Sequence, residues 1–164
     1  MIKEITSVGS VHAHIRVPGS KSITNRTLVC AALAQGESTI RNASDSEDTA
    51  LLANGLNQLG VLVRRQNDTL IVQGTGGKLY APKFPIPVGN AGTTLRFLIS
   101  LASLAQGRVV LEGASRMSER PISDLLEALA MVGVKANTDS AIPRYEVDGG
   151  TLNGGLARVN GEKS

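Results

Sequence analysis

Two short glycine-containing segments carry residue types that suit anion binding. Residues 18–22 read Pro-Gly-Ser-Lys-Ser and residues 89–94 read Gly-Asn-Ala-Gly-Thr-Thr, and each precedes a long apolar segment. The first turn of a helix presents unpaired N–H groups and the positive end of the helix dipole, and a glycine lets an anion approach that backbone closely. The expected ligand is therefore a phosphate or a carboxylate.

Either segment alone is more simply explained as a helix cap after a turn. Two copies that face the same way favour binding over capping. Lys21 adds a positive charge to the first copy, but the segment is not a Walker A loop, because that loop needs a glycine directly before the lysine.

A third segment, residues 116–121, reads Arg-Met-Ser-Glu-Arg-Pro. Arginine binds carboxylates and phosphates through paired hydrogen bonds, so an arginine in a loop beside two helix starts suits an anion clamp. An ion pair at the surface with Glu119 or Asp124 explains the same residues equally well. Spacing alone leaves both interpretations open.

The elements that must position these segments are duplicated. Residues 33–36 (Leu-Ala-Gln-Gly) recur as residues 104–107, about seventy positions later. Such a period indicates a repeated supersecondary unit. The expected units are residues 18–88 and 89–160, and a third unit is expected to start at 161 and to be truncated.

Within each unit the pattern predicts an inner helix, a strand, an outer helix and two more strands. The inner helices, residues 22–35 and 93–105, are apolar nearly all round and are expected to be buried on every side, with Cys30 as a small core residue. They are expected to start near Lys21 and Gly92 and to run parallel, with their N-termini together on one face. The predicted strands are residues 38–41, 61–65, 69–72, 108–111, 134–138 and 144–147.

Each outer helix has a single apolar stripe, formed by Leu52, Leu56 and Leu59 in the first unit and by Leu125, Leu129 and Val132 in the second. Asp45 and Asp48 fit a capping pair for the first outer helix, and Pro121 fits the first turn of the second. Gly60 and Gly133 are expected to end these helices. The fold class that follows is α/β (α+β), with parallel buried helices.

The composition of the 164 residues narrows the function further. Aromatic residues make up only 2%, so the core must be aliphatic, and stacking platforms for nucleic-acid bases are scarce. A net charge of +3 with scattered basic residues favours a small anionic metabolite over a polynucleotide. A single cysteine excludes a disulfide framework and a cysteine-based zinc site. Without a leader-like or membrane-spanning apolar run, a cytoplasmic protein is expected, with neither membrane nor nucleic acid as partner.

The three segments together closely resemble the N-terminal signatures of 5-enolpyruvylshikimate-3-phosphate (EPSP) synthases, in register from about Ile15 to Ser164. The matching residues are 18–22 with Asn25 and Arg26, 89–93 with Arg96, and 116–121. The resemblance implies transfer of the enolpyruvyl group of phosphoenolpyruvate to the 5-hydroxyl of shikimate 3-phosphate, with release of phosphate, in aromatic amino acid biosynthesis. It implies no metal and no organic cofactor.

The family fold has two similar domains, each made of three such units. The resemblance therefore implies that residues 18–164 are an incomplete N-terminal substrate-binding domain and that residues 1–17 are a strand segment that pairs with the absent second domain. Most general acids and bases are implied to lie in a missing C-terminal portion, present as the rest of the chain or as a separate chain. The isolated fragment is implied to be inactive.

The resemblance also implies a role for each matched residue. Lys21 is the implied catalytic residue and contacts both substrates. The residues implied to bind shikimate 3-phosphate are Lys21, Ser22 and Arg26, and those implied to bind phosphoenolpyruvate are Lys21, Asn90, Gly92, Thr93 and Arg120. Gly92, which has no Cβ, is expected to leave room for the phosphate end of phosphoenolpyruvate, whereas Arg96 is expected to be structural.

Two alternatives remain open. UDP-N-acetylglucosamine enolpyruvyl transferase shares the fold but characteristically carries a reactive cysteine in the loop that corresponds to residues 116–120, where this chain has none. The other alternative is a noncatalytic module that binds phosphate or nucleic acid, which steeply salt-dependent binding to random DNA would support. Phe97 stands where many EPSP synthases have a proline, so the resemblance leaves the response to glyphosate open.

Overall fold

The computed structural model describes residues 3–4, 9–139 and 142–159. The first unit comprises α1 (Lys21–Leu33), β1 (Gln35–Ile40), α2 (Glu47–Gln58), β2 (Leu62–Gln66) and β3 (Thr69–Thr75). The second comprises α3 (Gly92–Ala102), β6 (Ala105–Gly113), the 3-10 helix η1 (Ser115–Met117), α4 (Ser123–Met131), β7 (Lys135–Asp139) and β8 (Arg144–Gly149). Between them lie β4 (Leu79–Tyr80) and β5 (Ile86–Gly89). The predicted α/β repeat, with its order of elements, is confirmed.

The two units also share a sheet topology. The first sheet has the order β1-β3-β2, and the corresponding strands of the second have the order β6-β8-β7, with antiparallel pairing throughout. The connecting strands β4 and β5 both pair in parallel with β6, β4 near its start and β5 near its end. The connection between the units therefore covers the outer edge of the second sheet.

The last strand of each unit passes directly over the C-terminal end of its inner helix. A Cβ on Gly74 would overlap backbone carbonyl oxygens at the end of α1, and a Cβ on Gly149 would overlap those at the end of α3. Glycine is required at both positions because backbone meets backbone. The equivalent contacts show that the repeat extends to the packing of helix on sheet.

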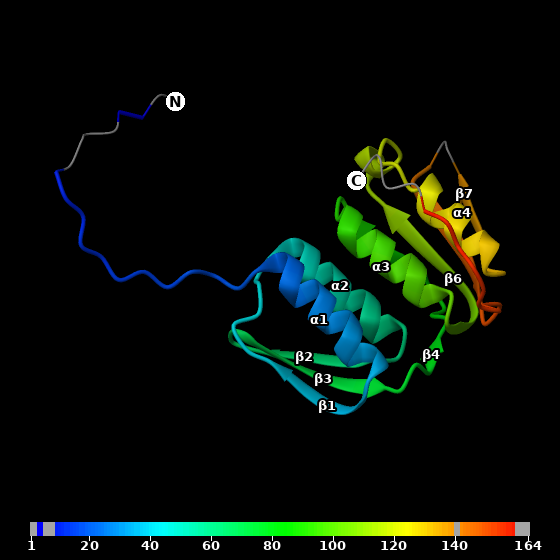
Figure 1. The fold of residues 1–164 in the computed structure, drawn as a ribbon, viewed down its shortest axis with the longest axis horizontal. Helices are drawn as coiled ribbons and strands as arrows, with labels where there is room; N and C mark the ends of the chain where they lie inside the picture. Colours follow the sequence, from blue (N-terminus) through cyan, green and yellow to red (C-terminus); the bar gives the residue numbers. More distant parts are fainter. Residues whose placement is uncertain (1–2, 5–8, 140–141, 160–164) are drawn as a thin grey trace.

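The three long helices run in the same direction. Figure 1 shows α1, α2 and α3 with their N-termini toward one end, and α2 packs against both of the others. Inner helices that start at Lys21 and Gly92 and run parallel are thus confirmed. The same end of the molecule receives the positive ends of three helix dipoles.

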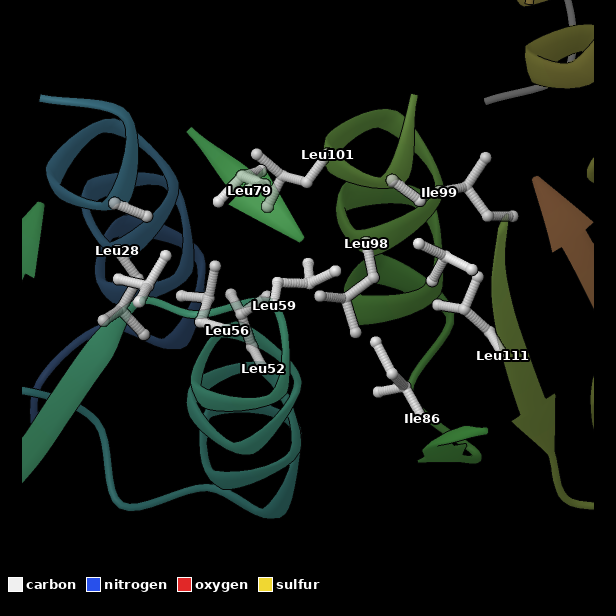
Figure 2. Close-up of a cluster of buried hydrophobic side chains, with 14 of the residues drawn as sticks. Leu28, Leu52, Leu56, Leu59, Leu79, Ile86, Leu98, Ile99, Leu101 and Leu111 are labelled. Atoms are coloured by element: carbon white, nitrogen blue, oxygen red, sulfur yellow. The ribbon is translucent and has the colours of Figure 1, made fainter. Parts of the chain in front are cut away.

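The core lies between the helices and the sheets and is almost entirely aliphatic, as Figure 2 shows for the leucine and isoleucine side chains around α2 and α3. The predicted stripe of α2 is fully buried, whereas the stripe of α4 is only partly buried at the margin of the core. Tyr145, which is 2% exposed, is the one buried aromatic side chain among the described residues.

The prediction that both inner helices are buried on every side is wrong for α1. Ile23 is 68% exposed, and Cys30, expected in the core, is also exposed. In the described part of the chain, α1 packs against α2 and the first sheet, and the Ile23 face stays open. By contrast, α3 is buried or partly buried at every position except Thr93, because it packs against α2, β5 and the second sheet.

The predicted starts of the outer helices need correction. Ser46, rather than an Asp45 and Asp48 pair, caps α2, because its extended backbone lets its Oγ accept a hydrogen bond from the Thr49 N–H. Pro121 precedes the cap of α4, which begins at Ser123, instead of lying in its first turn. The predicted ends are confirmed: Gly60 and Gly133 follow the two outer helices with φ of 96° and 91°.

The strands differ in length from the prediction. β1 begins earlier than expected, at Gln35, because pairing with β3 recruits glycine and polar residues of low β-propensity. β6 begins earlier, at Ala105, because its first two residues pair with β4 before its pairing with β8 starts at Gly107. β4 and β5 were not predicted, since pairing with β6 alone defines such short strands.

Residues 9–15 run away from the body of the molecule (Figure 1), and residues 9–17 form neither helix nor strand. The strand expected within residues 1–17 is therefore not seen in this described stretch. The third unit, expected from residue 161, lies outside the described residues. Across the described ranges, the helices are too short or too polar to cross a membrane.

Candidate functional site

The first helix start places a lysine beside a carboxylate. Ser20 caps α1 by accepting a hydrogen bond from the Ile23 N–H, and Lys21 is the first helical residue. Lys21 Nζ donates a hydrogen bond of 2.9 Å to Asp48 Oδ2, in the first turn of α2. The Lys21 side chain is 50% exposed, so its ammonium group remains accessible to a ligand.

Asp48 also ties the third helix to this site. Its backbone carbonyl accepts a hydrogen bond of 2.8 Å from Thr94 Oγ1, near the start of α3. The N-termini of α1, α2 and α3 are therefore joined through one residue, and each of these helices is long enough to carry a dipole. The edge of the molecule where these three helices begin therefore carries three positive helix ends and one ammonium group. Such an edge favours the binding of anions.

Behind this edge a buried polar network fixes the spacing of α1 and α2. Thr49 Oγ1 donates to Asn25 Oδ1 at 2.8 Å, and Thr24 Oγ1 accepts from the Ser44 N–H at 3.0 Å. Asn25 Nδ2 is the one buried side-chain donor that lacks a partner among the described residues. The two hydrogen bonds join α1 to the first turn of α2 and to the loop before it, and so restrict the relative movement of the two helix starts.

The start of α3 differs from the starts of α1 and α2 because no side chain caps it. Its N-cap residue is Ala91, so its first N–H groups are not satisfied by a capping oxygen. The Gly89 carbonyl accepts a hydrogen bond of 2.8 Å from the Ala114 N–H, which brings the predicted arginine segment beside this helix start. An uncapped N-terminus beside arginines is suited to binding a phosphate or carboxylate.

The arginine segment closes a pocket against this helix start. A pocket of about 280 Å³ is lined by Asn90, Arg116, Glu119 and Arg120. Neither arginine forms an ion pair within the part of the chain that the structure describes, so the predicted alternative of a surface pair with Glu119 or Asp124 is not seen. The anion clamp is the interpretation that this geometry favours.

The side chain of Arg120 occupies the space beside Gly92. A Cβ on Gly92 would lie 2.9 Å from Arg120 Nη1 and 3.4 Å from Arg96 Nη1. The expectation that this glycine leaves bare room for a phosphate is therefore corrected: it lets a guanidinium group lie against the first turn of α3. The positive charge and the helix start then act on the same volume.

Arg96 has structural partners, in agreement with its expected role. Its Nη1 donates to the Gly92 carbonyl at 3.2 Å and its Nη2 donates to the Pro121 carbonyl at 2.6 Å. These bonds join α3 to the end of the arginine segment.

Other predicted site residues are less closely assembled. Arg26 Nη1 donates to the Ser22 carbonyl at 3.0 Å, and both residues are exposed on α1. Thr93 is exposed at the start of α3. The structure brings Lys21 to the α2 and α3 starts through Asp48, and brings Asn90 and Gly92 to Arg120. Among the described residues, the side chains of Ser22, Arg26 and Thr93 form no hydrogen bond or ion pair with another helix. No group of three or more metal-binding side chains occurs in the described ranges.

Three residues of this region make contacts here that were not predicted from the sequence. Asp48 was interpreted as a cap, although its place in the first turn after Ser46 could have suggested a partner for Lys21. Thr94 stands beside a predicted ligand but points toward α2. Tyr145 reaches the arginine segment from β8, about thirty residues later, and its sequence context carries no signal of that contact.

The fold and the site together define an α/β repeat protein in which helix N-termini and an arginine-lined pocket lie at one end. A family model described as EPSP synthase (3-phosphoshikimate 1-carboxyvinyltransferase) matches residues 5–164. The chain belongs to the EPSP synthase family.

Individual relatives agree with this assignment. The chain is 41% identical over 148 residues to a 3-phosphoshikimate 1-carboxyvinyltransferase of Rhizobium etli, covering 85% of this chain and 35% of the relative. It is 38% identical to a protein of the same name from Syntrophobacter fumaroxidans, covering 100% of this chain and 39% of the relative. A solved EPSP synthase structure from Acinetobacter baumannii is 26% identical with a TM-score of 0.76, covering 83% of this chain and 32% of that one. The chain thus spans about a third of the length of these relatives.

Proposed function

We propose that this chain supplies one wall of the active site of a 3-phosphoshikimate 1-carboxyvinyltransferase. The observation that carries the proposal is the junction of three helix N-termini at Asp48, with Lys21 on one side and Arg120 on the other. The reaction joins two phosphorylated carboxylates, so the enzyme must offset their repulsion with fixed positive groups. The named relatives support this choice of substrates.

The proposed chemistry is addition followed by elimination. The 5-hydroxyl oxygen of shikimate 3-phosphate forms a bond to C2 of phosphoenolpyruvate while C3 gains a proton, and the hydroxyl proton goes to a base. Loss of a C3 proton then regenerates the double bond as phosphate leaves C2. Lys21 is the catalytic residue that this chain contributes, because its charge can follow the phosphate through both steps. The other acids and bases are assigned to the C-terminal portion of a longer protein.

Each substrate is assigned to one part of the edge. Asn90, Gly92, Thr93 and Arg120 bind phosphoenolpyruvate at the uncapped start of α3, where Arg120 meets the helix dipole. Ser22 and Arg26 bind shikimate 3-phosphate along the exposed side of α1, and Lys21 contacts both substrates.

The proposal includes a domain division and a location. Residues 18–164 form part of an N-terminal substrate-binding domain, and residues 1–17 pair with a second domain. That second domain is the partner that completes the site, and the protein acts in the cytoplasm.

Binding to the 164-residue chain is the first test. We expect weak binding of shikimate 3-phosphate in an NMR titration, and no phosphate release when phosphoenolpyruvate is added. Lys21→Met should weaken this binding, whereas Lys78→Met should not, because Lys78 is an exposed lysine in the turn before β4. Equal losses in the two variants would indicate nonspecific attraction. The noncatalytic alternative would be favoured if the chain bound random DNA with an affinity that falls steeply as the salt concentration rises, and did not bind shikimate 3-phosphate.

Activity is the second test. The chain is joined to the C-terminal portion of the Rhizobium etli relative, or produced together with it, and phosphate release is followed with both substrates. We expect turnover that Lys21→Met abolishes and Lys78→Met leaves intact. Turnover by the 164-residue chain alone would show that the general acid and base are wrongly assigned to the C-terminal portion.

A further inference from the structure

The segment that carries Arg116 and Arg120 is held by contacts from three directions. Its start is fixed by the backbone bond from Ala114 to Gly89, and its middle by Met117, which is fully buried. Its end is fixed by the bond of 2.6 Å from Arg96 to the Pro121 carbonyl. The position of Arg120 depends on the backbone between Met117 and Pro121.

A tyrosine from β8 contacts the start of that stretch. Tyr145 Oη donates a hydrogen bond of 3.1 Å to the Met117 carbonyl. The same carbonyl accepts a hydrogen bond of 3.2 Å from the Arg120 backbone N–H. The Met117 carbonyl therefore accepts hydrogen bonds from both Tyr145 and Arg120, and Arg120 is the residue whose side chain lies beside Gly92.

The hydroxyl of Tyr145 is not needed for packing. Tyr145 is 2% exposed in a core that is otherwise aliphatic, and a phenylalanine would fill the same volume. A buried tyrosine hydroxyl is tolerated only where it finds a partner, and here the partner is a backbone carbonyl of the arginine segment. Burial raises the pKa of the Tyr145 phenol, a rise that the nearby Arg96 guanidinium only partly offsets, so the hydroxyl stays a donor at neutral pH.

We infer that Tyr145 is a positioning residue, which orients the Met117 carbonyl so that the Met117–Arg120 turn holds the Arg120 guanidinium over the start of α3. This role rests on the proposed function, in which Arg120 binds phosphoenolpyruvate. Arg96 acts on the opposite end of the same stretch. An arginine fixed from both ends loses less conformational freedom when it binds an anion, so affinity for that anion rises.

The test is Tyr145→Phe in the 164-residue chain, with Tyr80→Phe as the matched control. Tyr80 is 53% exposed on β4, and its hydroxyl makes no hydrogen bond among the described residues. Hydrogen exchange of the Arg120 amide is measured by NMR, and dissociation constants are measured for phosphoenolpyruvate and shikimate 3-phosphate. Loss of one neutral hydrogen bond should speed Arg120 exchange by about three- to tenfold and weaken phosphoenolpyruvate binding by a similar factor. Binding of shikimate 3-phosphate, and all properties of Tyr80→Phe, should stay unchanged.

Every other result of these measurements also bears on whether Tyr145 positions Arg120. Unchanged Arg120 exchange in a folded Tyr145→Phe chain, or equal losses for both substrates, would reduce Tyr145 to a core residue. If Tyr145→Phe does not fold, the wild type decides. A slowly exchanging Arg120 amide together with a Tyr145 hydroxyl proton that is protected from exchange upholds the inference, and the absence of either protection overturns it. If the wild type binds neither substrate but its Arg120 exchange responds to Tyr145→Phe, the proposed function fails while the positioning role stands.

Discussion

Asp48 accepts a hydrogen bond of 2.9 Å from Lys21, so the lysine at the start of α1 is paired with a carboxylate at the start of α2. Both side chains remain partly exposed, at 50% for Lys21 and 26% for Asp48. A phosphate that approaches the helix starts must share Lys21 with this carboxylate. The pair therefore tunes the affinity of the edge for anions more than it stabilises the fold, because partly exposed ion pairs contribute little to stability.

Asp48→Asn should strengthen the binding of inorganic phosphate. Removal of a partly screened negative charge is expected to lower the dissociation constant by about two- to fivefold. The fold should lose about 0.3–1 kcal/mol, because an acidic residue leaves the first turn of α2. Isothermal titration and urea unfolding measure the two effects. Asp124→Asn, at the matching position in the first turn of α4, is the control and should change stability alone. Weaker phosphate binding by Asp48→Asn would mean that Asp48 holds Lys21 in its binding position.

Gly92→Ala should impair function without loss of stability. The added methyl group would lie 2.9 Å from Arg120 Nη1, so the arginine must move away from the helix start. We expect the dissociation constant for phosphoenolpyruvate to rise by about tenfold, which is about 1.4 kcal/mol, and that for shikimate 3-phosphate to change less. The unfolding free energy should stay within about 0.5 kcal/mol of the wild type, because alanine favours a helix. Equal effects on both ligands would contradict the placement of phosphoenolpyruvate at α3.

Gly55→Ala should instead lower the stability of the fold. Gly55 lies on α2, and a Cβ there would come within 2.6 Å of Leu98 Cδ1 and 3.2 Å of Ile86 Cγ2, both in the core. Overpacking should lower the unfolding free energy by about 1–3 kcal/mol despite the better helix propensity of alanine. Asn54→Ala, at an exposed position of the same helix, should change stability by less than about 0.5 kcal/mol. A Gly55→Ala protein as stable as the wild type would show that α2 and α3 can separate without cost.

Tyr145 should make stability sensitive to alkaline pH. Because burial raises the pKa of its phenol in the folded protein, the unfolded chain releases this proton first as the pH rises past about 10. The unfolding free energy then falls by about 1.4 kcal/mol per pH unit until the folded phenol also ionises. Tyr145→Phe cannot titrate, so the stability advantage of the wild type over this variant should be constant below pH 9 and shrink above pH 10. Urea unfolding of both proteins across this pH range measures the difference between their unfolding free energies. A difference that is the same at every pH would contradict the raised pKa.

The architecture could be predicted because the sequence contains the same structural unit twice. The repeated Leu-Ala-Gln-Gly segments and the matching stripes of α2 and α4 fixed the order of elements and the direction of the inner helices. Hydrophobic periodicity reports burial in the complete environment of a helix. The apolar Ile23 and Cys30 therefore indicated burial that the described part of the chain does not supply.

The candidate site was predicted by residue type but not by partner. Glycine, lysine and arginine in the right segments indicated anion binding, and the structure brings several of them to one edge. The pairing of Lys21 with Asp48, the position of Arg120 over Gly92 and the bond from Tyr145 to Met117 join segments far apart in the sequence. No local pattern encodes such contacts, because helix crossing and strand register set them.

The connection between the two units joins them into one folding body. β4 and β5 belong to the segment that leaves the first unit, yet they complete the outer edge of β6 in the second. Opening that segment would expose the backbone hydrogen-bonding groups of a strand edge, which are prone to pair with other chains. We therefore expect a single cooperative unfolding transition for the two repeats. A fragment that begins after β5 should be prone to aggregation, because the outer edge of β6 is then uncovered.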